Sequence, residues 1–311
     1  MTKRMLLAIL LLIVFALPAG CQKQGGEPTQ PTAPAPTILP PHTPEPSPTP
    51  TPDPVGEALA GMTVEQKAAQ LLVAGIEGTE PGEDAVQAVQ GYQVGGVILF
   101  GRNVESAEQL AALTNGLKEL NGDYTPLFLC VDQEGGRVDR MPPEVTDLPS
   151  ALDFGSIADP EARMDACFTL GQTLAAQCAA FGFNMDFAPS LDIWSNPENT
   201  VIGDRAFGTD AATVTGAANE TALGILSGGV IPVAKHFPGH GDTAVDSHYG
   251  LPVVDKSLEE LEELELRPFR QAIDTTCVYG TYGGDTSIPA IMVAHILLSQ
   301  IDPDNPASLS P

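Results

Sequence analysis

The feature that most constrains the fold is a regular alternation of apolar, strand-like runs with helix-like segments. Six apolar runs have the character of buried strands, at residues 71–76, 95–100, 126–131, 183–193, 230–236 and 290–296. Helix-like segments lie between them, at residues 106–120, 161–181 and 257–273. Continuous apolar strands that alternate with helices predict an α/β fold with a parallel sheet, most simply a TIM-type (β/α)8 barrel. About six of the eight strand units are present, so we expect an incomplete barrel.

The first residues of the chain have the anatomy of a secretory signal peptide. Residues 1–21 begin with Lys3 and Arg4, continue with an apolar run, and end in Ala19-Gly20-Cys21. A cysteine directly after small residues resembles a bacterial lipoprotein signal, in which Cys21 would carry the lipid. One departure is Pro18, which stands where that pattern prefers leucine. The alternatives are a simple cleaved signal and an uncleaved anchor, for which the apolar run is short.

A change of composition separates this leader from the rest of the chain. Residues 22–54 are crowded with Pro, Thr and Ser, which predicts a disordered, extended linker. Residues 55–311 have the length and apolar content of one large domain. We therefore expect an exported, extracytoplasmic domain, held at the cell membrane only through its lipid anchor.

The charge balance narrows the choice of partners. Forty acidic residues against 14 basic ones give a formal net charge of −26. We therefore expect no binding to nucleic acid or to an anionic membrane surface through long-range attraction. The run of acidic residues from Glu259 to Glu265 is expected to be a solvated helix face, with a cation site as the weaker alternative.

The cysteines other than Cys21 are expected to be mostly buried, small apolar groups. Cys130 lies in a strand-like run, and Cys167 and Cys178 lie on one helix-like segment. Eleven residues of helix span about 16 Å, which is far beyond the reach of a disulfide between these two.

Ionisable side chains are most concentrated in the fourteen residues from Lys235 to His248, which begin at the end of the fifth apolar run. His236 and His240 are four apart, as in a helical zinc pair, but the intervening Pro238 and the flanking glycines oppose a helix. We therefore expect no metal site, and a metal hydrolase is only the third alternative. Asp246 and His248 are two apart, so in an extended segment they share a side. A carboxylate that orients an imidazole in this way is typical of general acid/base catalysis.

Other polar residues follow the predicted strands in the same manner. The third run is followed by Asp132 and, after two glycines that permit a tight turn, by Arg140. A segment after the fourth run carries Arg205, and His295 lies near the end of the sixth. Because the carboxyl ends of parallel strands meet at one face of a barrel, these side chains predict an active site there.

Four ordered motifs resemble the catalytic barrel of glycoside hydrolase family 3, in its β-N-acetylhexosaminidase branch. They are Val131-Asp-Gln-Glu-Gly-Gly-Arg-Val, Asn184-Met-Asp-Phe-Ala-Pro-Ser-Leu-Asp, Val201-Ile-Gly-Asp-Arg-Ala-Phe-Gly, and Lys235-His-Phe-Pro-Gly-His-Gly-Asp-Thr through Asp246-Ser-His. The resemblance covers the chain from about Met62 to Pro311. It implies hydrolysis of β-linked N-acetylglucosamine in peptidoglycan fragments or chitin-type sugars, without a metal or organic cofactor.

The resemblance also implies a role for each matching residue. The sugar would contact Asp132, Arg140, Arg205, Lys235 and His236, by charge-assisted hydrogen bonds. His248 would be the general acid/base, paired with Asp246, in place of the carboxylic acid that most glycosidases use. His240 and Asp242 are expected to shape the loop.

The carboxylate nucleophile of a retaining enzyme is the missing element. The family carries this aspartate after a segment that matches Pro306-Ala-Ser-Leu-Ser, so we expect it beyond Pro311. The sequence is thus expected to be a C-terminally truncated enzyme that is inactive as it stands. The alternatives are a β-glucosidase of the same family and a surface lipoprotein that binds sugar without turnover.

Overall fold

The computed structural model describes residues 53–243, 250–274 and 287–311. Its main sheet has six strands in chain order, and every neighbouring pair is parallel. The strands are β1 (Val73–Gly75), β2 (Gly96–Ile98), β3 (Phe128–Val131), β4 (Met185–Asp186), β5 (Ile231–Phe237) and β7 (Ala290–Val293). Each lies inside one of the six predicted runs, or overlaps it, so the predicted parallel sheet is confirmed.

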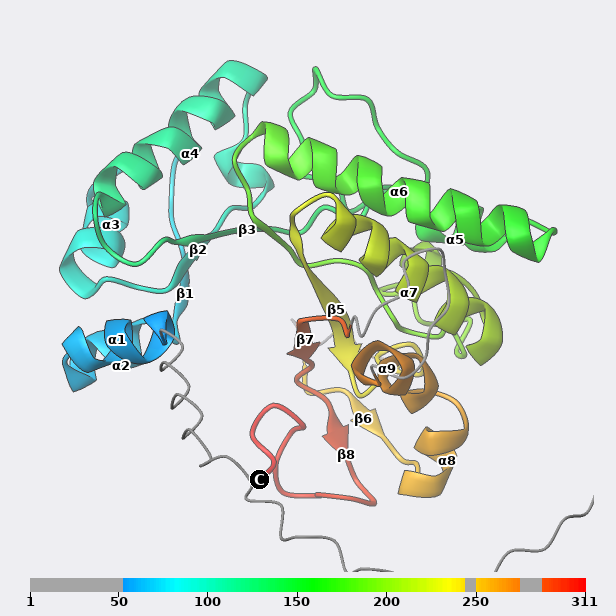
Figure 1. The fold of residues 1–311 in the computed structure, drawn as a ribbon. Coiled ribbons are helices and arrows are strands. Elements are labelled where there is room, and N and C mark those ends of the chain that lie inside the picture. The colour runs from blue at the N-terminus through cyan, green and yellow to red at the C-terminus, as the bar shows by residue number, and fades with distance from the viewer. Residues whose placement is uncertain (1–52, 244–249, 275–286) are drawn as a thin grey trace, which may run out of the picture. The chain divides into compact units, whose positions relative to one another are not determined.

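The sheet curls as part of a barrel, with helices along its outer side (Figure 1). The α-helices are α1 (Pro54–Gly61), α2 (Val64–Ala69), α3 (Glu83–Val86), α4 (Ala107–Asn121), α5 (Ala151–Gly155), α6 (Pro160–Ala180), α7 (Ala211–Ser227), α8 (Leu258–Glu263) and α9 (Leu266–Ile273). A π-helical turn, η1 (Gln87–Tyr92), and two 3-10 turns, η2 (Gly101–Asn103) and η3 (Gly203–Arg205), complete them. This is an incomplete TIM-type barrel, as the sequence predicts.

Local sequence signals explain where the outer helices begin. Ser106, Asp159 and Asp210 precede α4, α6 and α7, and each side chain accepts a hydrogen bond from a backbone N–H in the first turn. The longest pair, α6 and α7, packs closely because Gly171 leaves room for it. A Cβ atom at that position would lie 2.0 Å from the carbonyl oxygen of Thr221.

The predicted helix over residues 257–273 is wrong as a single element. It divides into α8 and α9 at Leu264, whose φ and ψ of −129° and −80° are not helical. Pro268 gives a physical reason, because a proline inside a continuous helix would clash with the carbonyl four residues earlier. In the observed structure Pro268 lies in the first turn of α9, where its missing N–H costs nothing.

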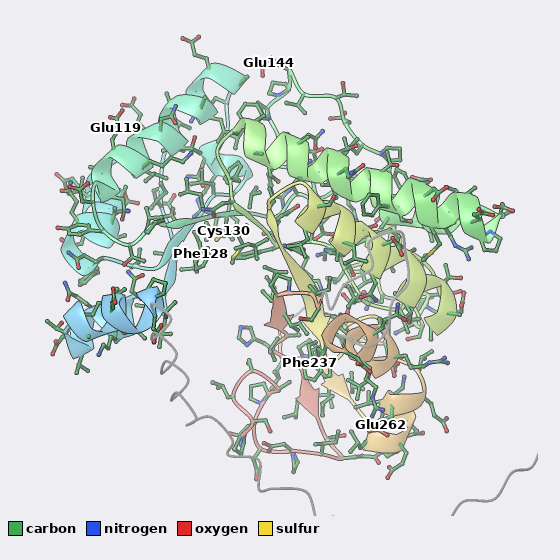
Figure 2. All side chains as sticks on the ribbon, viewed as in Figure 1. Glu119, Phe128, Cys130, Glu144, Phe237 and Glu262 are labelled. Atoms are coloured by element: carbon green, nitrogen blue, oxygen red, sulfur yellow. The ribbon has the colours of Figure 1, made fainter. Side chains whose placement is uncertain are left out.

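The break also corrects the expectation that all acidic residues of this segment face solvent. The Glu265 side chain is 1% exposed, and its Oε1 atom lies 2.5 Å from Nζ of Lys256. Phe237, at the end of β5, lies beside α9 (Figure 2), with its ring centroid 5.4 Å from that of Phe269.

The structure also has a second, small sheet, which the sequence did not predict. It pairs β6 (Val253–Val254) with β8 (Leu297–Leu298) in parallel. Val254 and Leu298 of this sheet form a separate cluster with Leu261, Ala294 and Ile296. Two-residue strands carry too little periodicity to be recognised in a sequence.

The main core lies between the sheet and the helices. It includes Val97, Leu99, Leu110, Leu113, Leu117, Leu129, Val131, Leu170, Leu174 and Ile225. Cys130, Cys167 and Cys178 are free and buried, which confirms the expectation for these three, whereas Cys21 and Cys277 lie outside the described residues. Within the part of the chain that the structure describes, no helix is long and apolar enough to cross a membrane.

Candidate active site

The site begins with the turn that follows β3. Gly135 and Gly136 have φ values of +80° and +55°, a region that other residues rarely adopt, and they reverse the chain there. The backbone N–H of Glu134 donates to the carbonyl of Val138 across the turn, at 2.9 Å. The turn holds Glu134 in the interior and leaves the Asp132 side chain 22% exposed.

Lys235, near the end of β5, joins these two carboxylates. Its Nζ atom lies 2.6 Å from Oδ1 of Asp132 and 2.6 Å from Oε1 of Glu134, and its side chain is 1% exposed. Burial alone would lower the pKa of Lys235, but the charges of Glu134 and Asp132 raise it above the ordinary value. The lysine is therefore a fixed positive charge that holds two segments of the chain together.

Arg205 binds Glu134 from the other side, in the forked geometry that guanidinium and carboxylate groups favour. Nε lies 2.9 Å from Oε2, and Nη2 lies 2.7 Å from Oε1. Burial opposes ionisation of Glu134, yet Lys235 and Arg205 hold the pKa of this carboxyl well below its usual range. With Asp132 charged, two cations and two anions balance in this cluster, which is what allows it to be buried.

His236 extends the cluster to a further buried acid, Asp192. The imidazole Nδ1 lies 2.6 Å from Oδ2 of Asp192, a side chain with no exposed surface. On its other side Nε2 lies 3.4 Å from Nη2 of Arg205. Burial lowers the pKa of His236 below its ordinary value even though Asp192 opposes this, so the ring is neutral near pH 7.

The loop that follows β5 is anchored at several points. The carbonyl of His240 accepts from Nδ2 of Asn199 at 2.8 Å, and Nδ1 of His240 lies 2.7 Å from the hydroxyl oxygen of Thr243. Gly241 lies against the preceding strand-end segment so closely that a Cβ atom there would be 1.7 Å from the carbonyl oxygen of Ile193. The predicted loop-shaping place of His240 thus has a structural basis.

Asp242 connects the same loop to the break before α9. Its Oδ2 lies 2.9 Å from Nζ of Lys256, which also binds the buried Glu265. The loop then enters residues 244–249. Asp246 and His248, the predicted acid/base pair, fall there and lie outside the described residues.

Arg140 takes a different position from the other predicted sugar-binding residues. Its Nη1 donates to the carbonyl of Asp139 at 3.1 Å, and its backbone N–H donates to Oε1 of Gln133 at 2.8 Å. A Cβ atom on Gly101, just after β2, would lie 3.7 Å from its Cδ. The structure thus brings together Asp132, Arg205, Lys235 and His236, while Arg140 lies on the β2 side of the turn.

His295, just after β7, is exposed, and its Nδ1 lies 2.6 Å from the hydroxyl oxygen of Ser308. Arg137, in the turn after β3, has a structural role. Its Nε lies 2.7 Å from Oδ1 of Asp204, and its Nη2 donates to the carbonyls of Thr200, Val201 and Ile202 at distances of 2.8, 2.7 and 2.9 Å. These bonds join the turn after β3 to the segment that carries Arg205.

Two site residues were missed by the sequence analysis, Glu134 and Asp192. Both lie in the motifs that resemble the family, but the sequence alone assigns no role to either. Their position in the sequence was the signal that could have identified them. An acidic residue inside or directly after an apolar run is expected to be buried, and a buried acid needs a hydrogen-bonding or charged partner. For Asp192, the run at residues 183–193 would have pointed to such a partner.

Sequence comparison decides the family to which this arrangement belongs. Residues 63–311 match the family described as "Glycosyl hydrolase family 3 N terminal domain". The chain belongs to glycosyl hydrolase family 3. The resemblance to its β-N-acetylhexosaminidase branch is supported by relatives named β-hexosaminidase. That of Methylobacillus flagellatus is 36% identical over 237 residues, which cover 76% of this chain and 64% of the relative.

A second relative of this family 3 chain carries the same name. The β-hexosaminidase of Nitrosomonas eutropha is 39% identical over 219 residues, which cover 70% of this chain and 59% of the relative. The chain thus spans about three fifths of the length of these curated relatives.

Solved structures show the same family 3 fold. A family 3 β-N-acetylglucosaminidase from Paenibacillus sp. str. FPU-7 matches with a TM-score of 0.71 and 40% identity, over 80% of this chain and 45% of that one. NagZ from Neisseria gonorrhoeae, in complex with N-trifluoroacetyl-D-glucosamine, matches with a TM-score of 0.67 and 35% identity. That match covers 77% of this chain and 67% of that one.

Proposed function

We propose that this family 3 protein is a retaining β-N-acetylhexosaminidase. It would release terminal β-linked N-acetylglucosamine from peptidoglycan fragments or chitin-type oligosaccharides. The observation that carries the proposal is the buried, charge-balanced cluster of Asp132, Glu134, Arg205 and Lys235 at the carboxyl ends of the parallel strands. Support for the sugar comes from relatives that are named β-hexosaminidase or were solved with an N-acylated glucosamine.

Within the cluster, Asp132 is the group offered to the substrate. One of its oxygens accepts from Lys235, and the carboxylate remains partly exposed. A carboxylate held in this way accepts short, charge-assisted hydrogen bonds from sugar hydroxyls. Because Lys235 and Arg205 are both fixed by Glu134, the binding groups need no reorganisation when the sugar arrives.

The proton transfer is assigned to the predicted pair Asp246 and His248. An imidazole of near-neutral pKa can protonate the leaving oxygen and later accept a proton from the attacking water. The anchored segment from Gly239 to Thr243 leads directly into this pair. Retention also requires a carboxylate nucleophile.

The protein is further proposed to be an exported lipoprotein. The support is the charged and apolar leader that ends in Cys21, followed by the Pro/Thr-rich linker of residues 22–54. Replacement of Cys21 by Ala should move the protein from the membrane fraction to the soluble fraction and abolish its labelling by a fatty-acid analogue. Continued labelling of the variant would refute lipidation at this residue.

The activity is tested by comparing two chromogenic substrates with the full-length protein. A β-N-acetylglucosaminide should be hydrolysed with a kcat/KM at least about 100-fold higher than that of the matching β-glucoside. NMR of the first product should show the β-anomer. Preference for the glucoside would establish the β-glucosidase alternative, and saturable binding without turnover would establish the sugar-binding one. Variants His248→Ala and Asp246→Asn assign the proton transfer, with Arg102→Ala as the matched surface control.

A further inference from the structure

The buried carboxylate of Asp192 has more partners than a simple ion pair requires. Oδ2 lies 2.6 Å from Nδ1 of His236 and accepts from the hydroxyl of Ser190 at 3.0 Å. Oδ1 accepts from the backbone N–H of His240 at 2.6 Å and from that of His236 at 3.3 Å. One carboxylate therefore binds both the ring at the end of β5 and the start of the loop after it.

The two sides of the His236 ring face groups of opposite character. Asp192 can only accept a hydrogen bond, because burial opposes its ionisation but the neighbouring donors lower its pKa to about 2. Arg205 can only donate, because a guanidinium remains protonated and has no acceptor. A neutral ring between them must carry its proton on Nδ1 and present a lone pair from Nε2.

The lone pair is only partly used inside the protein. Its separation of 3.4 Å from Nη2 of Arg205 is longer than a typical N–H hydrogen bond, and the His236 side chain is 16% exposed. Lys235, next in the chain, and Arg205 are positively charged groups near the ring, and both disfavour a second proton on it. Nε2 is thus a preset hydrogen-bond acceptor on a partly exposed ring.

We propose that Asp192 is a positioning residue that fixes His236 as the Nδ1–H tautomer, so that Nε2 accepts a hydrogen bond from a sugar hydroxyl. Through its other oxygen, Asp192 holds the first residues of the loop in place by the N–H of His240. The sugar contact rests on the proposed function, whereas the tautomer depends only on the geometry of the described residues.

Substitution by asparagine separates positioning from simple packing, because the two side chains have the same shape. In Asp192→Asn, the amide oxygen can continue to accept hydrogen bonds from the backbone N–H groups of His236 and His240. The amide NH2 group then faces Nδ1 of His236. The ring must then move its proton to Nε2, where it points at Arg205, a group that cannot accept it. Asp192→Asn therefore removes the acceptor without removing the ring.

The test is 15N NMR of the histidine ring nitrogens in the full-length protein, with calorimetry using N-acetylglucosamine. In the wild type, His236 should be the neutral Nδ1–H tautomer at about pH 7. Asp192→Asn should shift the ring to the Nε2–H form and weaken binding at least about tenfold. Ser190→Ala, which removes one donor to the same carboxylate, should keep the tautomer and bind within about twofold of the wild type.

Three results would overturn the proposal. They are a charged or Nε2–H ring in the wild type, an unchanged tautomer in Asp192→Asn, and unchanged affinity in that variant. If Asp192→Asn does not fold, the wild-type spectrum alone decides the tautomer. A wild type with the Nδ1–H ring that binds no N-acetylglucosamine would refute the proposed function and the sugar contact, while the fixed ring would stand.

Discussion

Nζ of Lys235 and Oε1 of Glu134 lie 2.6 Å apart, in side chains that are 1% and 5% exposed. Ion pairs with so little solvent are costly to form, and they persist only where further partners complete them. Here Asp132 and Arg205 are those partners. The pair joins the turn after β3 to β5 at the face where the site lies, so it links the stability of the barrel to the geometry of its binding groups.

Removal of the lysine should therefore be severe. Lys235→Met leaves two carboxylates close together without their shared cation, and should lower the free energy of unfolding by about 3 to 5 kcal/mol. Chemical denaturation followed by circular dichroism measures this loss. Arg102→Met is the matched control, because its pair with Glu77 is largely exposed and should contribute less than about 1 kcal/mol. Equal losses in the two variants would contradict the account of the cluster.

Acid should destabilise the protein through Asp192. Its pKa in the folded protein, about 2, is below the ordinary aspartate value, so the unfolded chain binds protons first as the pH falls. Stability from this carboxylate is present above about pH 4 and is lost towards pH 2, in an amount of about 2 kcal/mol. Thermal unfolding between neutral pH and pH 3 measures it. Asp192→Asn should show a shallower acid dependence, and an identical slope in both proteins would exclude this origin.

The close contact at Gly241 makes a steric prediction. Gly241→Ala places a methyl group 1.7 Å from the carbonyl oxygen of Ile193, so the loop must move away from the strand-end segment. We expect a stability loss of about 1 to 3 kcal/mol and weaker binding of N-acetylglucosamine. Gly61→Ala, with nothing within 4 Å of the new atom, is the control and should leave both unchanged. Full binding by Gly241→Ala would show that the loop position does not matter.

The buried thiols should resist modification. Burial raises the pKa of Cys130 to about 12 and that of Cys167 to about 11, and the pKa of Cys178 lies well above its ordinary value. In a variant with serine at positions 21 and 277, Ellman's reagent at about pH 8 should modify none of the three before denaturation. Rapid reaction of one of these thiols in the folded protein would show that the structure around it opens to solvent, and would contradict this prediction.

The sequence predicted the sheet well because its signal is local. Each strand is an apolar run, and chain order equals strand order, so runs such as residues 95–100 and 126–131 could be placed without long-range information. The helix break at Leu264 depends on how Glu265 turns inward to Lys256. That contact joins residues nine apart, and helical periodicity alone does not reveal it.

The site was predicted only in part, for a similar reason. Asp132 and Arg205 follow their strands, and Lys235 and His236 lie near the end of β5, so the strand ends pointed to all four. Glu134 and Asp192 are recognised as site residues only when their partners are known, because the surrounding hydrogen-bond donors determine what a buried carboxylate does. The fold brings Glu134 to Arg205 across 71 residues of chain, and Asp192 to His236 across 44.

The central claim is that the cluster around Lys235 binds an N-acetylglucosamine unit through Asp132. Calorimetric titration of the full-length protein with N-acetylglucosamine, for the wild type and for Asp132→Asn, tests it most directly. The amide can still accept from Lys235, so the variant should remain folded, but its affinity should fall at least about tenfold because the charge offered to the sugar is gone. Equal affinity in the two proteins, or no binding by the wild type, would contradict the account.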